Sequence, residues 1–148
     1  MYYDYGQFLQ DCSKLKATVE ASGFAPDSLL YIARGGLTLA HFLSMAWDLR
    51  NVYSINAVSY TPNKTQHDLI LSHLPKLDES TRRVLILDDI VDTGASLGAV
   101  LVRMREEYPR VEFKSACLFQ KGAASVWADF YVREALEWID FFWEVDLS

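Results

Sequence analysis

Long hydrophobic runs are missing from this chain of 148 residues, and so is a basic N-terminal start. No stretch approaches the ~20 consecutive apolar residues that are needed to cross a membrane. The first four residues carry none of the positive side-chain charge that opens a secretory signal peptide. We therefore expect a cytoplasmic protein without a membrane span.

Positive charge is scarce as well. The chain has 14 basic and 20 acidic side chains, a formal net charge of -6 at pH 7 and a pI near 5.0. A protein that binds the phosphate backbone of DNA or RNA needs a basic face. We therefore expect no nucleic acid among its partners.

Cysteine and histidine are too few and too scattered for a structural zinc site. The two cysteines are Cys12 and Cys117, and the three histidines are His41, His67 and His73. Their positions match none of the ligand spacings of zinc-binding motifs. Two buried thiols in a reducing compartment are the expected state of the cysteines.

Glycine and proline are also few, with seven and four residues, which argues against linkers, low-complexity segments and disorder. A chain of about 150 residues buries roughly 70% of its unfolded surface, which is enough for one sizeable core. We therefore expect residues 1–148 to form a single domain.

Helix-like and strand-like periodicities alternate along the chain. Apolar residues at steps of three and four predict helices over residues 7–21 and 37–49 and in the segment that follows Ser96. Short runs rich in apolar, β-branched and aromatic residues predict strands at residues 29–33, 52–59, 84–87 and 111–119, with a short one at 130–132. This alternation predicts an α/β fold with a central, mostly parallel sheet and flanking helices.

Residues 60–80 form a long polar connection that contains Pro62, Asn63 and Pro75. Connections of this length in compact domains are often covers of active sites. Residues 69–71, inside this connection, are compatible with either a helix or a strand.

Residues with potential catalytic or binding roles are concentrated where predicted strands end. In open α/β sheets, ligands bind at this edge. One apolar run ends in Asp88 and Asp89, and Asp92 follows before a Thr-Gly-Ala-Ser turn at residues 93–96. The glycine and the two hydroxyls of that turn, at the start of a helix, form an anion cradle suited to a phosphate. Helix capping by Asp92 or Thr93 is the plainer interpretation, but capping needs one acid and this turn has three.

Residues 84–96 as a whole resemble the thirteen-residue phosphoribosyl pyrophosphate motif of type I phosphoribosyltransferases, with its four apolar residues, two acids and Thr-Gly turn. Over nearly its whole length the chain is similar to the bacterial xanthine-guanine members of that family. The resemblance implies the family fold: a central sheet with flanking helices, a small hood from about residues 120–148, and a flexible loop of about residues 60–80 that starts at Ser59 and Tyr60.

The resemblance also implies roles for the motif. Asp88 and Asp89 would hold the ribose hydroxyls and Mg²⁺, with Asp89 as the metal residue, provided that the chain turns there so that both reach one ligand. Asp92 would take or guide the proton of the purine imidazole ring as the glycosidic bond forms, a general-base role. The 5'-phosphate would bind to Asp92, Thr93, Gly94, Ala95 and Ser96.

A second loop, Arg34-Gly35-Gly36, follows an earlier predicted strand and resembles the pyrophosphate loop of the family. Its glycines expose backbone amides, and its arginine offers a planar fork of donors to an anion. By itself this tripeptide is typical of a tight turn with a surface arginine. Its place one strand–helix unit before the main motif favours the pyrophosphate site.

Purine binding is implied for three residues nearer the C-terminus. Lys121 would donate to the 6-oxo group and so select a 6-oxopurine over adenine, while Trp138 stacks on the base and Ile139 supplies carbonyl contacts. The chain departs from the family pattern at Gly122, where a proline is usual. For the aromatic residues 141–143 we expect packing in the core or in a subunit interface.

The sequence therefore predicts a Mg²⁺-dependent purine-salvage enzyme that transfers a phosphoribosyl group from phosphoribosyl pyrophosphate to guanine, xanthine or hypoxanthine, without ranking the three bases. The main alternative is a non-catalytic regulator on the same fold that senses nucleotides or phosphoribosyl pyrophosphate. An enzyme acting on adenine, orotate or uracil is disfavoured by Lys121 and by Trp138 with Ile139. The resemblance also implies a homodimer or a homotetramer.

Overall fold

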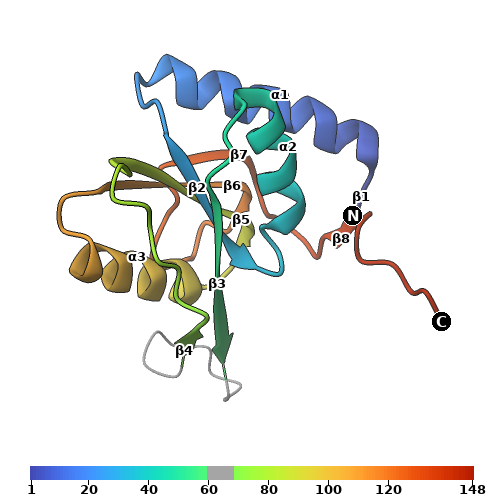
Figure 1. Cartoon of the computed structure of the whole chain (residues 1–148). Helices are drawn as coiled ribbons and strands as arrows, with labels where there is room; N and C mark the ends of the chain where they lie inside the picture. The colour runs from blue at the N-terminus through green and yellow to red at the C-terminus, as the bar shows by residue number, and fades with distance from the viewer. Residues whose placement is uncertain (60–68) are drawn as a thin grey trace.

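The computed structural model describes residues 1–59 and 69–148 and contains a six-stranded sheet with helices on both faces and a separate two-stranded sheet (Figure 1). None of the described helices is long and apolar enough to cross a membrane. In chain order the elements are β1 (Tyr2–Tyr3), α1 (Tyr5–Ala21), β2 (Ser28–Ala33), α2 (Leu37–Trp47), β3 (Val52–Ser59), β4 (Leu69–Ser72), β5 (Arg83–Val91), α3 (Ala95–Glu107), β6 (Glu112–Gln120), β7 (Phe130–Glu134) and β8 (Asp140–Phe141).

The main sheet has the strand order β4-β3-β2-β5-β6-β7. β2 pairs in parallel with both β3 and β5, as β5 does with β6 and β6 with β7. Within the described ranges, β4 alone runs antiparallel to its neighbour in this sheet. The predicted α/β fold with a mostly parallel sheet is thus confirmed. The strand order changes direction between β2 and β5, which is the point where such sheets bind ligands.

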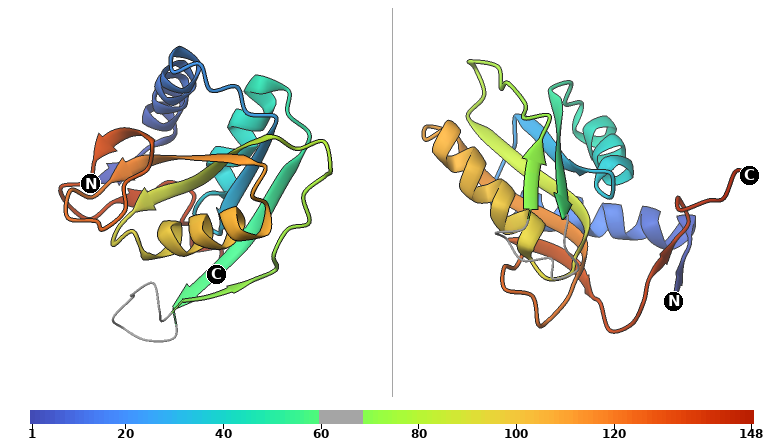
Figure 2. Two further views of the ribbon diagram at one scale, coloured as in Figure 1. Left: turned by 90° about the vertical axis from the view of Figure 1, so that its left-hand side faces the viewer. Right: turned by 90° about the horizontal axis from the view of Figure 1, so that it is seen from below.

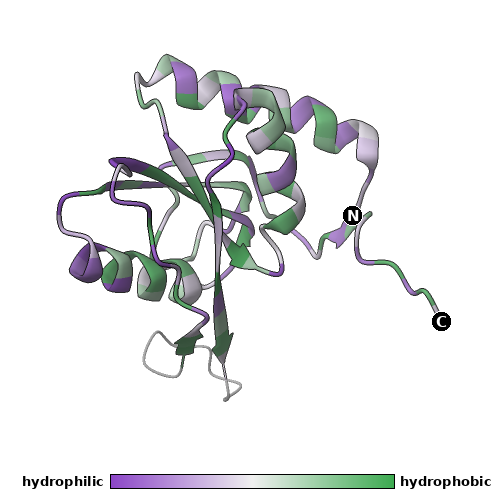
Figure 3. Ribbon diagram, in the orientation of Figure 1, coloured by the Kyte–Doolittle hydropathy of each residue, from purple (hydrophilic) through white to green (hydrophobic). Residues whose placement is uncertain are grey.

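Side chains of β5 alternate between two apolar cores, as the pleat of a strand requires. Leu85 and Leu87 pack with α1 and α2 on one face of the sheet, whereas Val84 and Ile86 pack with α3 on the other. Figure 2 shows these helices on opposite sides of the sheet, and Figure 3 shows hydrophobic colour along the central strands. The apolar run 84–87 is therefore a strand covered on both faces, as predicted.

The predicted end of this strand before Asp88 and Asp89 is wrong. β5 continues to Val91, because its neighbour β6 is equally long and pairs with it as far as Val91 and Gln120. The two acids nevertheless come together as expected, because a Cβ on Gly35 would lie 2.5 Å from an Asp89 carboxylate oxygen and 2.8 Å from an Asp88 carboxylate oxygen. The register of β5 on β6 pairs Asp88 with Cys117 and Ile90 with Phe119, and the carboxyl groups of Asp88 and Asp89 both face the turn that follows β2.

The long connection after β3 contains a strand. Leu69–Ser72 forms β4, with Leu69 opposite Ser59 of β3. Of the two alternatives for residues 69–71, the strand is therefore correct, and backbone hydrogen bonds hold it on the sheet edge within the long connection of residues 60–80. Ser59 is the last residue of β3 rather than the start of a loop. Tyr60 lies outside the described residues.

A two-stranded sheet joins the N-terminal and C-terminal segments, because β1 pairs in parallel with β8. The backbone amides of Asp140 and Phe142 donate to the carbonyl oxygens of Met1 and Tyr3, at 2.8 and 3.1 Å. Residues 120–148, expected to build a hood, thus receive a strand from the N-terminus, while their own β7 extends the main sheet.

Both cysteines are buried free thiols, as predicted. Burial, together with the nearby carboxylates of Asp11 and Asp88 respectively, raises the pKa of Cys12 and of Cys117 to about 12. Both thiols therefore stay protonated at neutral pH and act as small apolar groups of the two cores.

Candidate functional site

Three cavities meet beyond the carboxyl end of β5. The β5–α3 cavity has a volume of about 260 Å³ and is lined by Ala57, Ser59, Leu69, Asp88, Ile90, Asp92 and residues 93–97. The β6–β8 cavity has a volume of about 420 Å³ and is lined by Asp89, Ile90, Asp92, Lys121, residues 135–139, Phe141 and Glu144. The β2–α2 cavity has a volume of about 650 Å³ and is lined by Arg34, Gly35, Leu37, Thr38, Asp89 and residues 143–145.

These cavities share walls and so form one site. Ile90 and Asp92 line both the β5–α3 and the β6–β8 cavity, whereas Asp89 and Glu144 line both the β6–β8 and the β2–α2 cavity. A ligand that extends through all three must pass along the end of β5. The structure therefore brings together residues from four separate predicted stretches: 34–36, 88–96, Lys121 and 138–139.

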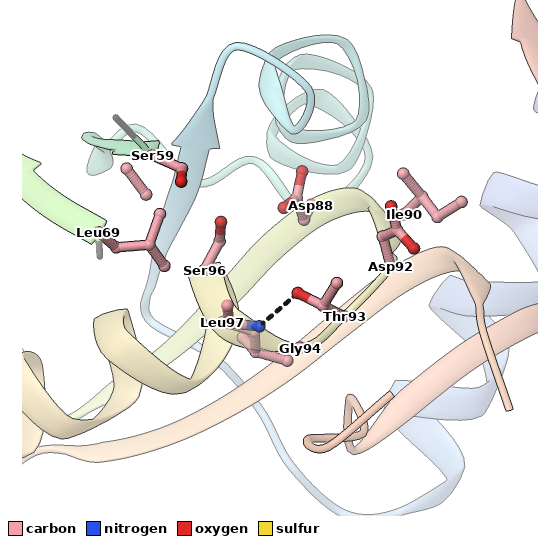
Figure 4. A pocket seen from close by; sticks show the side chains of 11 residues that line it. Ser59, Leu69, Asp88, Ile90, Asp92, Thr93, Gly94, Ser96 and Leu97 are labelled. Atoms are coloured by element: carbon pink, nitrogen blue, oxygen red, sulfur yellow. Dashed lines mark hydrogen bonds between the residues drawn. The ribbon is translucent and has the colours of Figure 1, made fainter. Parts of the chain in front are cut away.

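The turn between β5 and α3 presents its backbone to the β5–α3 cavity (Figure 4). Gly94 stands at the N-cap of α3 with a φ of 87°, a conformation that favours glycine. The N-cap position is thus Gly94 rather than Asp92 or Thr93, but the Thr93 hydroxyl does accept a hydrogen bond from the amide of Ala95, the first residue of α3, at 3.2 Å. With Ser96 in its first turn, the N-terminus of α3 offers amides and a hydroxyl to an anion.

Ser125 and Val126, which the sequence analysis did not single out, support this turn. The amide and hydroxyl of Ser125 both donate to the Thr93 carbonyl oxygen, at 2.9 and 3.0 Å. A Cβ on Gly94 would lie 2.5 Å from the Val126 amide nitrogen, so the two backbones are in direct contact. The fully buried Gln120 fixes this segment, because its amide group bonds to the Lys121 carbonyl and to the Ala128 amide, which follows the segment in the chain.

The carboxyl groups of Asp88 and Asp89 are held in an unfavourable environment for negative charge. Each accepts one hydrogen bond from the next backbone amide in the chain, at 2.9 and 2.7 Å. Burial, and then the charge of Asp89, raises the pKa of Asp88 well above its usual range. Burial also raises the pKa of Asp89, with a contribution from Glu144. A cation or a hydroxyl donor placed here relieves this cost.

The carboxylates at this site fit Mg²⁺ that is bound partly by the protein and partly by the phosphates of a substrate. Among residues 1–59 and 69–148, no three acidic, histidine or cysteine side chains are grouped as a complete protein cage for a metal. Mg²⁺ commonly takes one or two carboxylates and completes its shell with water and substrate phosphates. Asp89, the predicted metal residue, opens into two of the cavities and offers such a carboxylate.

The turn between β2 and α2 is packed against β5 so closely that its glycines are required. A Cβ on Gly35 would lie 2.5 Å from an Asp89 carboxylate oxygen, and one on Gly36 would lie 2.4 Å from the Leu87 carbonyl oxygen. The peptide bond between Ala33 and Arg34 is cis. Arg34 and Gly35 line the β2–α2 cavity, and Gly36 is the N-cap of α2 beside it. The predicted anion loop therefore lies next to the acids of β5.

Lys121 and Asp92 form an ion pair of 2.8 Å between the Lys121 Nζ and an Asp92 carboxylate oxygen. Both side chains are about half exposed and both line the β6–β8 cavity. The residue predicted to bind the 6-oxo group and the residue predicted to guide the proton are thus in direct contact. A flat ring that accepts at one edge atom and donates at the next would satisfy both.

Residues 135–139, which we call the wall, close the other side of the β6–β8 cavity. Trp138 is 78% exposed and its indole nitrogen donates to Asp140 at 2.8 Å, whereas Ile139 is buried. The Trp138 carbonyl oxygen accepts from the N-terminal ammonium of Met1 at 2.8 Å. The predicted stacking surface therefore stands at the mouth of the cavity.

The aromatic residues after the wall pack as predicted. Phe141 is buried, and Phe142 and Trp143 pack against the core that lies beneath α1 and α2. Phe141 and Trp143 are stacked with ring centroids 4.7 Å apart. Sequence reasoning missed Glu144 and Thr38, which line the site. Nothing in their local pattern distinguishes them from surface residues, because only the fold brings them to the end of β5.

Comparison with known proteins identifies the family. A family model described as a phosphoribosyl transferase domain matches residues 1–148. The xanthine-guanine phosphoribosyltransferase of Gluconobacter oxydans is 30% identical over 143 residues, which cover 95% of this chain and 82% of that protein. The enzyme of the same name from Cereibacter sphaeroides is 34% identical over 120 residues, or 79% of this chain and 68% of that protein.

Solved structures agree with these relatives. The Helicobacter pylori xanthine-guanine-hypoxanthine phosphoribosyltransferase superposes with a TM-score of 0.92 at 46% identity and covers 99% of this chain and 94% of that one. A purine phosphoribosyltransferase from Pyrococcus horikoshii gives a TM-score of 0.80 at 29% identity, with the same coverage of both chains.

Proposed function

This chain belongs to the phosphoribosyl transferase domain family, and from that premise we propose that it is a purine-salvage enzyme. It transfers the 5-phosphoribosyl group of phosphoribosyl pyrophosphate to a 6-oxopurine and gives the nucleoside 5'-monophosphate and pyrophosphate. The observation that carries the proposal is the meeting of three cavities along residues 89–92. One is suited to a phosphate, one to a flat base and one to a second anion.

The β5–α3 cavity is assigned to the 5'-phosphate. Backbone amides at the start of α3 and the hydroxyls of Thr93 and Ser96 are donors, and a helix N-terminus favours an anion. Ser125 and Val126 hold the turn from behind, so that its donors are oriented before the substrate arrives. Such preorganised donors lose little entropy on binding.

The acids of β5 are assigned to the ribose and its metal. Asp88 and Asp89 accept hydrogen bonds from the ribose hydroxyls, and Asp89 binds Mg²⁺, which screens the charge of the pyrophosphate when bound. Their raised pKa values support this role, because buried carboxylates without such partners are unfavourable. We therefore propose that activity depends on Mg²⁺.

The leaving pyrophosphate is assigned to the β2–α2 cavity. Arg34 donates to its oxygens, and the Gly35 amide lies at the start of α2, where the helix dipole favours negative charge. The Gly36 amide, which was expected to be exposed, instead donates to the Ile32 carbonyl oxygen at 3.0 Å. Stabilising the departing anion lowers the barrier to breaking the bond between the ribose and the pyrophosphate.

The base is assigned to the β6–β8 cavity. The purine replaces the ion pair between Lys121 and Asp92: its 6-oxo group accepts from Lys121, and the adjacent imidazole N–H donates to Asp92. Asp92 then holds or removes this proton as the glycosidic bond forms. Trp138 stacks on the ring, and the carbonyl of Ile139 contacts its far edge.

The decisive experiment supplies the protein with phosphoribosyl pyrophosphate, Mg²⁺ and one base at a time: guanine, xanthine, hypoxanthine or adenine. We expect nucleotide and pyrophosphate in equal amounts with the 6-oxopurines, little with adenine, and none after the metal is removed with EDTA. Failure to form nucleotide with any base would contradict the proposed enzyme and favour a ligand-sensing regulator.

We also propose that the protein is a cytoplasmic homodimer or homotetramer. Met45, in the last turns of α2 and outside the three cavities, is 71% exposed, and exposed apolar side chains are frequent at subunit interfaces. Sedimentation equilibrium measures the mass, and a monomer at all concentrations would contradict this proposal.

A further inference from the structure

The wall has little packing of its own. It is an irregular link between β7 and β8, and Leu136 and Trp138 in its centre are among the most exposed apolar side chains of the described residues. Yet a base that stacks on Trp138 and contacts the Ile139 carbonyl needs both groups at fixed positions. Beyond the bond between the Met1 ammonium and the Trp138 carbonyl oxygen, their positions are set at the two ends of the wall, where Ala135 and Ile139 are buried.

The C-terminal end of the wall is held by the N-terminal strand. β8 has two residues and its strand partner is β1, through the amides of Asp140 and Phe142. Tyr3 of β1 is fully buried, with its ring 5.0 Å from that of Phe119 and 5.8 Å from that of Phe141, measured between centroids. Any movement of Tyr3 is therefore transmitted to β8.

One buried carboxylate of α1 connects both ends. The Tyr3 hydroxyl donates to Asp11 Oδ2 at 2.7 Å. Arg133, the second-last residue of β7, donates to the same carboxylate through Nε at 2.6 Å and through Nη2 at 3.2 Å. Asp11 is fully buried, so a lost donor there is costly. Arg133, two residues before the wall, and Tyr3, the strand partner of Phe141 two residues after it, thus donate to one acceptor.

The chemistry of this cluster makes it rigid. A planar guanidinium that bonds both oxygens of a carboxylate fixes orientation as well as distance. Burial and the hydrogen bond to Asp11 raise the pKa of Tyr3, and the separate hydrogen bond between Arg133 and Asp11 raises the pKa of Arg133. Both groups therefore remain donors throughout the physiological pH range.

We propose that Asp11, Tyr3 and Arg133 form a positioning cluster for the purine site. They touch no cavity of the site, but they fix the wall and hence the location of Trp138 and Ile139. The expected effect on purine binding rests on the proposed function. The expectation that the cluster fixes the wall does not.

The kinetic test is Tyr3→Phe, which removes one hydrogen bond and retains the ring. We expect about a tenfold rise in the KM for guanine, as for the loss of a charge-assisted hydrogen bond, while the KM for phosphoribosyl pyrophosphate and kcat change less than about twofold. Tyr2→Phe is the matched control, because Tyr2 is the adjacent residue of β1 and is 64% exposed. Arg133→Lys, which acts from the other end, should give the same pattern.

The structural test is hydrogen exchange and needs no activity. In Tyr3→Phe we expect the amides of Asp140 and Phe142 to exchange about tenfold faster, and the amides of β5 to exchange as in the wild type. Unchanged exchange at the two amides would overturn the proposal. So would equal rises in both KM values, which indicate a general loss of structure. If the wild type makes no nucleotide, the proposed function fails and the exchange result still decides whether the cluster holds the wall.

Discussion

The two sides of the site are built differently. The floor, which we define as residues 88–96, comprises the end of β5, one of the longest strands of the sheet, and the start of α3. It is in direct contact with Ser125, Val126 and the turn before α2. The wall is an irregular segment between short strands and is largely exposed. Groups that must hold charges are thus placed on rigid elements, where precision is greatest. Recognition of a neutral base is left to a segment whose position depends on distant anchors.

Asp92 stands where the floor meets the wall, and its loss should have the largest effect. Asp92→Asn keeps the size of the side chain but removes the proton acceptor, so we expect a fall in kcat of about a thousandfold. Steady-state rates with guanine measure this fall. Asp48→Asn, on the C-cap of α2 away from the cavities, is the control. Full activity in Asp92→Asn would remove Asp92 from the proton transfer.

Truncating one side chain beneath the floor and one in the wall should change the free energy of unfolding by different amounts. Leu85→Ala, beneath the floor, leaves a cavity in a fully buried position, and we expect the free energy of unfolding to fall by about 3 kcal/mol. Leu136→Ala, in the wall at 84% exposure, should change it by less than about 0.5 kcal/mol. Urea denaturation measures both. Similar losses in both variants would show that the wall is as well packed as the floor.

Removal of the stacking surface should affect binding and leave the fold intact. For Trp138→Ala we expect the KM for the base to rise by about tenfold to a hundredfold, since base–aromatic stacking contributes ~1–3 kcal/mol. The thermal midpoint should stay within about 2 °C, because the side chain is mostly exposed. Trp127→Ala, outside the three cavities, is the matched control. An unchanged KM would place the base elsewhere.

The pH dependence of stability should reveal the cost of burying negative charge in the floor. The pKa of Asp89 is raised above its ordinary value of 3.8, so the folded state binds this proton more tightly than the unfolded state does. Stability from this group therefore grows as pH falls through the raised pKa, and the full cost is present at neutral pH. Asp89→Asn should raise the free energy of unfolding at pH 7.5 and raise it less near pH 4, while activity is lost. A variant that is less stable than the wild type at pH 7.5 would contradict this reasoning.

The floor could be predicted from sequence because its signals are local. A continuous apolar run predicts a doubly covered strand, and acids followed by a Thr-Gly turn indicate a ligand site at its end. The prediction failed where a partner strand decides the outcome. Asp88 and Asp89 resemble the end of a strand, but pairing with the equally long β6 carries β5 on to Val91.

The supports of the site could not be predicted, because they depend on contacts between distant residues. The pairing of β1 with β8 involves only two residues on each side, and so short a strand leaves no periodic pattern. Gln120 and Ser125 look like surface polar residues in the sequence. In the fold Gln120 is fully buried, and Ser125 donates a hydrogen bond to the Thr93 carbonyl oxygen.

The pairing of β1 with β8 also has a consequence for the order of folding. It closes a loop of nearly the entire chain, and such contacts carry the highest entropic cost before they form. The parallel strands from β2 to β6 and their helices need shorter closures. We therefore expect the proposed phosphate and ribose subsites to be complete while the proposed base subsite is still open, so that selectivity for the base is acquired last.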